Sequence, residues 1–269
     1  MDTVSLGGVE VSRFIVGSNP FSGFSHQGIE ADARMTHYYT TQHIKDVLYD
    51  AERLDLTATL GRTDHHMMRM LLEYWDEGGK LIWLAQTCPG VGPQEWGIAW
   101  ARDNGAKACH LHGGHLDYLY AQGRIDEVPP LISMIHDAGM PAGIAAHNPD
   151  VIRWAEENVE VDYYMCSYYN SMRRDERPEH VHGYAEWFWE SDRETMIELI
   201  QKLSKPAIHY KVMAAGRNDP ADALRVVAGA MRPGDAVCVG VFPEVKADML
   251  EEDVRLLERY LAERAATVA

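Results

Sequence analysis

Residues 5–21 read SLGGVEVSRFIVGSNPF, and the fold can be predicted outward from this stretch. Two short runs in which apolar and polar residues alternate flank the pair Gly7-Gly8, a pattern typical of a β-hairpin with a tight turn. The apolar run FIVGS at 14–18 follows at once and is typical of a buried strand. We therefore predict a hairpin followed by the first strand of a larger sheet.

Similar apolar runs recur along the chain, each separated from the next by a polar turn and a helical segment. The runs after residues 14–18 are LTATL (56–60), LIWLAQT (81–87), ACHLH (108–112), AGIAAH (142–147), DYYMCSYYN (162–170), AIHYKVM (207–213) and AVCVGVF (236–242). Helical periodicity marks residues 41–54, 67–75, 129–138, 192–203 and 219–231. Parallel strands require such crossovers. We predict an α/β fold in which residues 1–269 form a single (β/α)8 TIM-barrel domain with the hairpin at its bottom.

Two connections are unusually long for a compact domain. Residues 20–40 follow the first strand, and residues 171–191 follow the sixth and contain the segment EWFWE. Long loops in compact domains are commonly functional. We predict that Trp187 and Trp189 cover the barrel mouth and contact a ligand there.

The composition of the chain limits the classes of partner that it is expected to bind. The net charge of −16 disfavours binding to nucleic acid and to anionic membranes. The acidic stretch 251–263 is interpreted as a solvated helix face. Neither a membrane-spanning run nor a secretory signal is expected, so we predict a cytoplasmic protein with a small polar substrate, and a homo-oligomer is left open. The four cysteines lack CxxC pairing and are predicted to be reduced: Cys88, Cys109, Cys166 and Cys238.

The opening stretch resembles the N-terminal hairpin and first strand of the aldo/keto reductases, and the resemblance continues through most of the barrel. It is carried by LHGG (111–114), AAHNPD (145–150), SYYN (167–170), HYKVMAAG (209–216) and VGVFPEVKADMLEEDV (239–254). The last of these is similar to the segment with which that family binds cofactor phosphate. The resemblance implies an aldo/keto reductase-like barrel.

The residues that the family uses for hydride transfer are largely replaced. The resemblance implies a tetrad of Asp, Tyr, Lys and His, and it aligns Thr59 with the aspartate, Asp64 near the tyrosine and Gln86 with the lysine, so that only His112 matches. Cys166 replaces the glutamine that contacts nicotinamide, and the last strand lacks the basic residues that grip a 2′-phosphate. We therefore expect the fold to be shared, the reaction to differ, and NADP(H) not to be the cofactor.

Histidines gather at the predicted catalytic face. Seven of the 13 histidines lie on or just after barrel strands: His65, His66, His110, His112, His115, His147 and His209. Strand alternation places His112 and His147 toward the mouth from neighbouring strands. The candidate catalytic residues are Lys211, Asp64, His112 and Tyr169. The candidate substrate-binding residues are Asn19, Arg62, Gln86, Asn148, Asn170, Trp187 and Trp189.

Three interpretations of this cluster remain open. In the first, His112 and His147 with Asp64 or His66 bind a divalent zinc, manganese or iron ion that polarises an oxygen. In the second, no metal is needed, and Lys211 acts as a general base or Schiff-base nucleophile. In the third, the polar side chains only line the pocket and hold substrate hydroxyls.

The function expected from these residues is that of a metal-assisted or acid/base lyase, isomerase or hydrolase acting on a small sugar-like or keto-sugar molecule. The aromatic and carboxamide side chains predicted at the mouth suit such a ligand. Two alternatives belong to other classes. One is an NADP(H)-dependent oxidoreductase, and the other is a sugar-binding barrel without catalysis.

Overall fold

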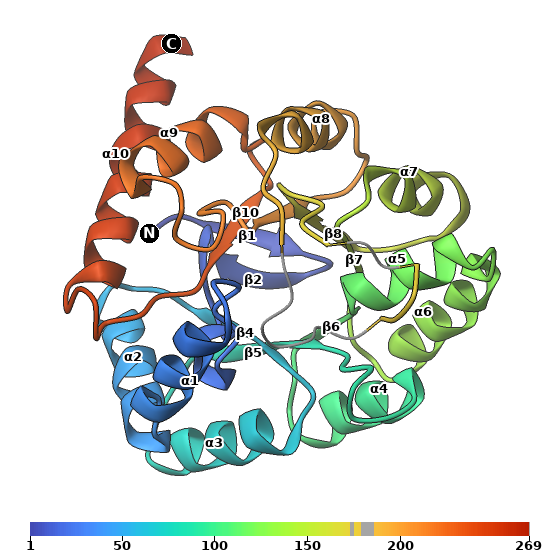
Figure 1. The fold of residues 1–269 in the computed structure, drawn as a ribbon, viewed down its shortest axis with the longest axis horizontal. Helices are drawn as coiled ribbons and strands as arrows, with labels where there is room; N and C mark the ends of the chain where they lie inside the picture. Colours follow the sequence, from blue (N-terminus) through green and yellow to red (C-terminus); the bar gives the residue numbers. More distant parts are fainter. Residues whose placement is uncertain (173–174, 179–185, 269) are drawn as a thin grey trace.

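The computed structural model describes residues 1–172, 175–178 and 186–268. Within this part of the chain, parallel strands close into a barrel in the order β10-β3-β4-β5-β6-β7-β8-β9, and a two-stranded antiparallel sheet precedes them (Figure 1). The hairpin strands are β1 (Thr3–Leu6) and β2 (Val9–Ser12). The barrel strands are β3 (Phe14–Gly17), β4 (Ala58–Arg62), β5 (Ile82–Gln86), β6 (Ala108–Leu111), β7 (Ala142–Ala146), β8 (Tyr163–Ser167), β9 (Ala207–Tyr210) and β10 (Ala236–Val239). The predicted (β/α)8 barrel is confirmed.

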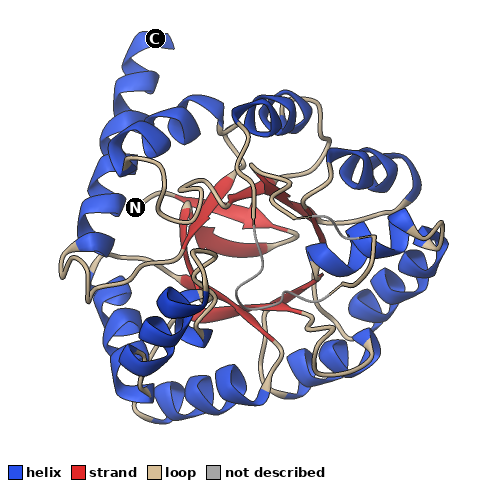
Figure 2. Cartoon of the chain, viewed as in Figure 1, coloured by secondary structure: helices blue, strands red, loops and turns tan. Residues whose placement is uncertain are grey.

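Helices surround the barrel on its outside (Figure 2). They are α1 (Ile29–Tyr38), α2 (Thr41–Arg53), α3 (His65–Asp76), α4 (Gln94–Asp103), α5 (Gly113–Ala121), α6 (Val128–Asp137), α7 (Pro149–Asn158), α8 (Glu190–Ile200), α9 (Pro220–Ala230) and α10 (Met249–Val268), with short 3₁₀ turns at Pro20–Ser22 and Ile125–Glu127. Several begin at a side chain that accepts a backbone N–H of the first turn, as Asp64, Asn148 and Asp219 do. These caps explain why the predicted helices begin close to the observed positions.

The segment 20–40 differs from the prediction of a long loop, because it contains α1. Its sequence offers few apolar residues, so helical periodicity is weak there. Asp32, in the first turn of α1, accepts hydrogen bonds from both the backbone N–H and the hydroxyl of Ser25. Met35 and the adjacent Tyr39 are buried against the core. Tertiary contacts therefore stabilise a helix that the local pattern does not indicate.

The hairpin closes the bottom of the barrel, as predicted. Val4, Leu6 and Val11 are buried and belong to the same apolar cluster as the inward-facing side chains of the barrel strands. Gly7 has a φ of 58°, and a Cβ there would lie 2.7 Å from the Cβ atoms of Pro141 and Asp162. Glycine is therefore required where the hairpin turn meets the N-terminal ends of β7 and β8.

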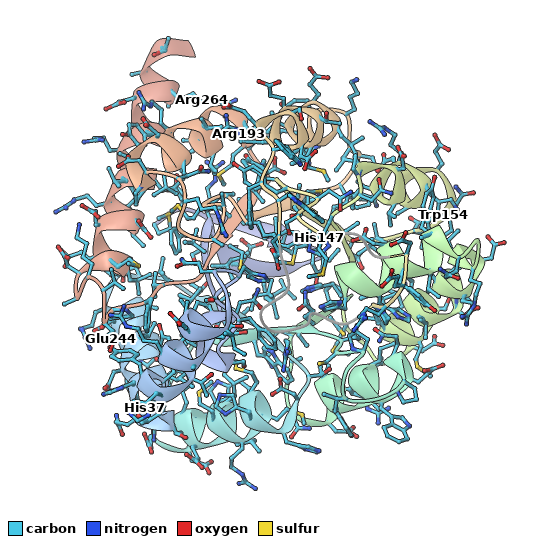
Figure 3. All side chains as sticks on the ribbon, viewed as in Figure 1. His37, His147, Trp154, Arg193, Glu244 and Arg264 are labelled. Atoms are coloured by element: carbon cyan, nitrogen blue, oxygen red, sulfur yellow. The ribbon has the colours of Figure 1, made fainter. Side chains whose placement is uncertain are left out.

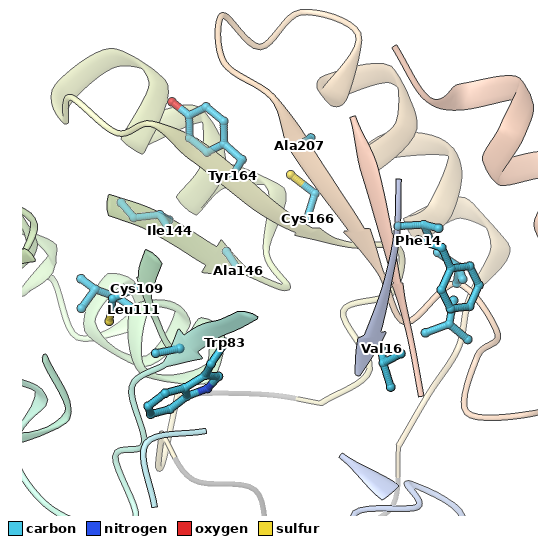
Figure 4. Packing of buried hydrophobic residues seen from close by; sticks show 14 of the residues in the cluster. Phe14, Val16, Trp83, Cys109, Leu111, Ile144, Ala146, Tyr164, Cys166 and Ala207 are labelled. Atoms are coloured by element: carbon cyan, nitrogen blue, oxygen red, sulfur yellow. The ribbon is translucent and has the colours of Figure 1, made fainter. Parts of the chain in front are cut away.

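Side chains alternate between the barrel interior and the helix layer. Ala58 and Leu60 face the interior, whereas Thr59 between them is fully buried and donates its hydroxyl to the carbonyl of Val16. Figure 4 shows part of the helix-side packing, including Trp83 and Ile144. Thr59 thus faces away from the mouth, and the β4 residue facing inward near the mouth is Leu60.

Two further observations concern the lengths of the helices and the state of the cysteines. None of the helices in the described part of the chain is long and apolar enough to cross a membrane. All four cysteines are free and buried. Burial raises the pKa of Cys109 and Cys238 to about 12, so these thiols stay protonated and behave as small apolar side chains.

Candidate active site

A cavity of about 730 Å³ opens at the C-terminal ends of the barrel strands. Its inner part is lined by one residue from each of β4, β5, β8 and β9 and by the residue that follows β9: Leu60, Gln86, Met165, Tyr210 and Lys211. Its outer arm runs outward between α1 and the start of α10 and is lined by Arg34, Phe242, Lys246, Glu252 and Asp253. Ligand sites in this fold lie at this face, so this cavity is the candidate active site.

A network of charged side chains forms one wall of the cavity. The Oε1 atom of Glu186 lies 2.5 Å from Nδ1 of His26, and its Oε2 atom lies 3.5 Å from Nζ of Lys211. The side chains are 1% exposed for Glu186, 12% for His26 and 9% for Lys211. A buried carboxylate within ion-pair distance favours the charged form of an amine. The ion pair with Glu186 thus favours the ammonium form of Lys211, and the predicted role of Lys211 as a base or Schiff-base nucleophile stays a prediction.

The backbone that presents this network is strained. His26 and Lys211 have φ values of 58° and 57°, in the left-handed region that costs a side-chain-bearing residue about 1 kcal/mol or more. Lys211 follows directly on β9, so the sharp turn redirects its side chain over the mouth. Strain of this kind clusters at ligand sites. Both residues that contact Glu186 are thus held in unfavourable backbone conformations.

The segment 186–189 reaches the site with the opposite face from the one predicted. Trp187 and Trp189 are 42% and 63% exposed, whereas Glu186 and Phe188 turn inward. The Phe188 ring packs at 5.4 Å on Tyr169, and the guanidinium of Arg217 lies 4.4 Å from its centroid. Residues alternate in an extended segment. Glu186 and Phe188 therefore face inward, and the ligand contacts predicted for Trp187 and Trp189 stay a prediction.

The alternation of exposed and inward side chains in residues 186–189 predicts how replacing each aromatic residue with alanine changes the stability of the protein. Trp187→Ala and Trp189→Ala should change the free energy of unfolding by less than about 0.5 kcal/mol, because exposed side chains lose little packing. Phe188→Ala should lower it by about 1–3 kcal/mol, because its half-buried ring loses Tyr169 and Arg217. Chemical denaturation of the three variants is the measurement. A larger loss for either tryptophan than for Phe188 would contradict the arrangement.

His147 follows directly on β7 and is held by a buried carboxylate. Its Nδ1 atom lies 2.7 Å from Oδ2 of Asp117 on α5, and the backbone N–H groups of His147 and Asn148 also donate to Asp117. His147 and Asp117 are 7% and 4% exposed. Figure 3 labels His147 on the side of the barrel formed by β7 and β8. The imidazole is thus fixed in orientation.

His110 lies deeper, inside the barrel. Its Nε2 atom lies 3.2 Å from the amide nitrogen of Gln86, and its Nδ1 atom lies 3.3 Å from the hydroxyl of Tyr163. Burial lowers the pKa of His110 to about 3, so the ring is neutral. A neutral ring accepts from Gln86 at one nitrogen and donates to Tyr163 at the other. Gln86 lines the cavity as predicted, and His110 orients it from below.

The predicted metal ligands do not come together. Among the described residues, no group of three or more His, Cys, Asp or Glu side chains is placed to hold a metal ion. His66 is exposed on the first turn of α3, and Asp64 caps that helix by accepting from the N–H of Met67 at 2.9 Å. His147 directs Nδ1 at Asp117, while His112 is half-buried at the start of α5. The predicted centre at His112, His147, Asp64 and His66 is therefore corrected.

Other predicted residues serve the scaffold. Arg62 donates to Oδ2 of Asp64 at 2.5 and 2.9 Å, and its guanidinium stacks on the ring of Phe24. A structural ion pair therefore replaces the catalytic role predicted for Asp64 and the ligand contact predicted for Arg62. Asn148 caps α7. Asn170 is exposed, and its backbone N–H bonds to Asp192.

Two predicted residues lie at or beside the cavity wall. Asn19 lines the cavity, and its amide nitrogen is 3.3 Å from Nε2 of His26. Tyr169 is buried behind the wall, where its hydroxyl accepts from Asn218, a residue that lines the cavity. Tyr169 therefore supports the wall and does not meet the requirement for the predicted catalytic contact.

Sequence reasoning missed Glu186, His26, Asp117 and Asp253. The phase of alternation in 186–189 could have indicated Glu186 together with Phe188. Asp117 falls between the buried Leu116 and Leu119 on α5, which is a signal for a buried carboxylate. Asp253 was interpreted as part of a solvated face, yet it is 3% exposed, and burial and Glu252 raise its pKa to about 7.

Comparisons with known proteins were made at the level of sequence and structure. No family model matches the sequence. No curated protein matches it either. A Pseudomonas aeruginosa protein described as an aldo-keto reductase superposes with a TM-score of 0.65 at 16% identity, over 96% of this chain and 94% of that chain.

Two further structures are similar at lower scores. The holo form of an aldo-keto reductase from Bacillus halodurans gives a TM-score of 0.57 at 14% identity, over 96% of this chain and 91% of that chain. A truncated 3-deoxy-D-arabino-heptulosonate 7-phosphate synthase from Thermotoga maritima gives 0.57 at 12% identity, over 99% and 93%. At these identities the likeness concerns the fold, and this chain therefore has a divergent aldo/keto reductase-like barrel.

Proposed function

We propose that this protein is an enzyme that moves a proton next to the carbonyl group of a small polyhydroxylated molecule, as a lyase or isomerase does. The observation that carries this proposal is the position of Lys211, 9% exposed in the wall of the cavity and paired with the buried Glu186 carboxylate. A preorganised cation in a site that excludes water stabilises the negative charge that develops on a carbonyl oxygen. Lys211 is assigned this role.

The reaction step balances without a further reactant. The C–H bond next to the carbonyl breaks, its proton goes to a base of the site, and its electron pair forms a C=C bond. The carbonyl π pair moves to oxygen, where the Lys211 ammonium stabilises the enolate. Return of the proton to the same carbon gives exchange. Isomerisation needs the neighbouring hydroxyl to pass its proton to the enolate oxygen before the proton returns to the other carbon. If a hydroxyl on the next carbon leaves instead, it takes the proton that the base removed and departs as water, which gives the lyase outcome.

The lining suits a sugar-like ligand. Asn19, Gln27, Gln86 and Asn218 contribute carboxamide groups, which both donate and accept hydrogen bonds. Tyr210 contributes an aromatic side chain to the same wall. Pockets that combine a few polar groups with aromatic surface orient small polar ligands. The proposed substrates are therefore hydroxyketones and keto-sugars.

The experiment is deuterium exchange followed by proton NMR. The purified protein is incubated in D₂O with a panel of small hydroxyketones and keto-sugars, and loss of the signal from the hydrogen next to the carbonyl is measured against a protein-free control. Enzyme-dependent loss supports the proposal. Binding seen by ligand-observed NMR without exchange would instead support the non-catalytic sugar-binding barrel.

A second candidate function is that of an NADP(H)-dependent oxidoreductase. The structural likeness to aldo-keto reductases, one of them in its holo form, favours it. The cavity also extends along its outer arm to the start of α10, which gives an elongated ligand room beyond the barrel mouth. A direct binding measurement separates the two candidates.

We expect NADPH to bind with a Kd weaker than about 1 mM. Both cations of the outer arm are engaged, Arg34 by Glu244 at 2.6 Å and Lys246 by Glu252 at 2.5 Å, and Asp253 adds a buried carboxyl. Phosphate groups would therefore meet compensated cations. Titration monitored by tryptophan fluorescence is the measurement. A Kd of about 1 μM would establish the second candidate in place of the first.

A further inference from the structure

We infer that the outer arm of the cavity is a subsite for the primary ammonium group of a ligand, and that Asp253 is the residue that binds it. The ligand class is that of small aliphatic amines. The subsite is separate from the reacting groups at the inner end of the cavity, so it goes beyond the proposed function and stands without it.

Asp253 is a buried carboxyl on the wall of the outer arm. It lines the cavity and is 3% exposed. Its Oδ1 atom has no hydrogen-bond partner among the residues that the structure describes. Buried carboxyl groups in folded proteins are normally paired or hydrogen-bonded. Asp253 therefore lacks a donor, and the cavity is the side from which a ligand can supply one.

Asp253 also lacks a cation of its own. Lys246 and Arg34 line the outer arm but pair with other carboxylates, Lys246 with Glu252 at 2.5 Å and Arg34 with Glu244 at 2.6 Å. Burial raises the pKa of Asp253 to about 7, the nearby Glu252 adds to this shift, and Lys246 opposes it. The missing partner is therefore one that brings positive charge as well as a donor.

An ammonium group meets both requirements. It has three N–H donors and a positive charge, as the side chain of lysine does. A metal ion is not favoured, because no group of three or more His, Cys, Asp or Glu side chains within the described ranges is placed to hold one. A phosphate group would meet the Asp253 carboxyl and cations that are already paired. A hydroxyl would supply a donor without the charge.

The remaining wall of the outer arm suits the carbon chain of an amine. Val241, Phe242 and Met249 line the same cavity and offer apolar surface. The guanidinium of Arg34 lies 5.5 Å from the centroid of the Phe242 ring, so this ring already accepts a cation. Amines such as the lysine side chain place their methylene groups on apolar surface and their charged end on a polar group. The outer arm offers both surfaces next to each other.

The test uses two small probes that share a five-carbon chain, aminopentanol and pentanediol. They differ in one terminal group, which is an ammonium in the first and a hydroxyl in the second. Binding to the purified protein is measured by ligand-observed NMR titration at pH 8, where a carboxyl with a pKa of about 7 is mostly ionised. The wild type should bind aminopentanol about 10- to 100-fold more tightly than pentanediol, as expected for hydrogen bonds to a charged group.

Asp253→Asn is the decisive variant, because it removes the charge and nearly preserves the shape of the side chain. It should lower the affinity for aminopentanol by about 10- to 100-fold. Glu251→Gln is the matched control, since it removes an exposed carboxylate from the neighbouring position on α10, outside the residues that line the cavity. The affinity of this control for both probes should stay within about threefold of the wild type. Urea denaturation checks that both variants are folded.

The combined results decide whether the subsite exists. A preference for aminopentanol that disappears in Asp253→Asn and persists in Glu251→Gln supports it. A preference that survives in Asp253→Asn would overturn it, because the amine then binds elsewhere on this protein of net charge −16. A preference lost in both variants would overturn it as well, since the total charge and not Asp253 would be responsible. Equal or absent binding of the two probes by the wild type would show that Asp253 is a buried carboxyl that no amine reaches.

Discussion

Replacing Lys211 with methionine is expected to lower the rate of deuterium exchange by about 10³-fold. Methionine keeps the length of the side chain but removes the charge that stabilises the enolate oxygen, and loss of one such donor costs about 10²–10³ in rate. The measurement is the NMR exchange assay on the best substrate of the panel. Lys246→Met is the matched control, because Lys246 lines the outer arm of the same cavity and is bound to Glu252.

The same substitution leaves the buried Glu186 carboxylate with less compensation, which also lowers stability. The double variant Lys211→Met/Glu186→Gln removes both charges and should recover most of that loss, since an uncompensated buried charge is the main cost of breaking a buried pair. The double variant should remain inactive. If it regains exchange within tenfold of the wild type, Lys211 contributes to the fold and not to the reaction.

The barrel could be predicted from sequence because its signals repeat and support one another. Each of the eight strands is short, yet the recurring apolar runs such as 14–18 and 142–147 leave only a parallel sheet with helical crossovers. The Gly7-Gly8 turn indicated the hairpin. Segment 29–38 was missed because α1 is stabilised by contacts of Asp32, Met35 and Tyr39 and not by its own periodicity.

The position of the site could be predicted from the sequence, but the contacts among its residues could not. Strand alternation predicted that His147 and Lys211 belong near the mouth, since the ends of parallel strands meet there, and Lys211 lines the cavity. Their partners are set by tertiary contacts, because Asp117 is 30 residues from His147 and Glu186 is 25 residues from Lys211. Residue types alone suggested metal ligands. The carboxylates that pair with these side chains were not visible in any local pattern.

Asp253→Asn is expected to stabilise the protein at alkaline pH. Burial first, and the nearby Glu252 second, raise the pKa of Asp253 to about 7 from its ordinary value of 3.8, while Lys246 opposes this shift. The unfolded chain ionises this carboxyl at its ordinary value, so unfolding releases a proton between these two pH values. Stability is therefore lost as the pH rises through this window, and above it the full cost remains, about 4 kcal/mol.

Asparagine removes that cost while nearly preserving the shape of the side chain. The gain in the free energy of unfolding should be about 4 kcal/mol at pH 8, should shrink as the pH falls below 7, and should vanish below about pH 4, where the carboxyl is neutral in both states. Urea denaturation of the wild type and the variant across this range is the measurement. Glu251→Gln, an exposed neighbour on α10, should change stability by less than about 0.5 kcal/mol at every pH.

If Asp253→Asn stabilises the protein, that result also indicates whether the outer arm of the cavity binds a ligand. Asp253 is 3% exposed, its Oδ1 has no hydrogen-bond partner among the described residues, and it lines the outer arm. A buried carboxyl that lowers stability is the kind of residue retained at a site where a ligand supplies the missing donor. Equal stability of the two proteins at pH 8 would show instead that solvent reaches this carboxyl, and the outer arm would then be an open groove rather than a binding surface.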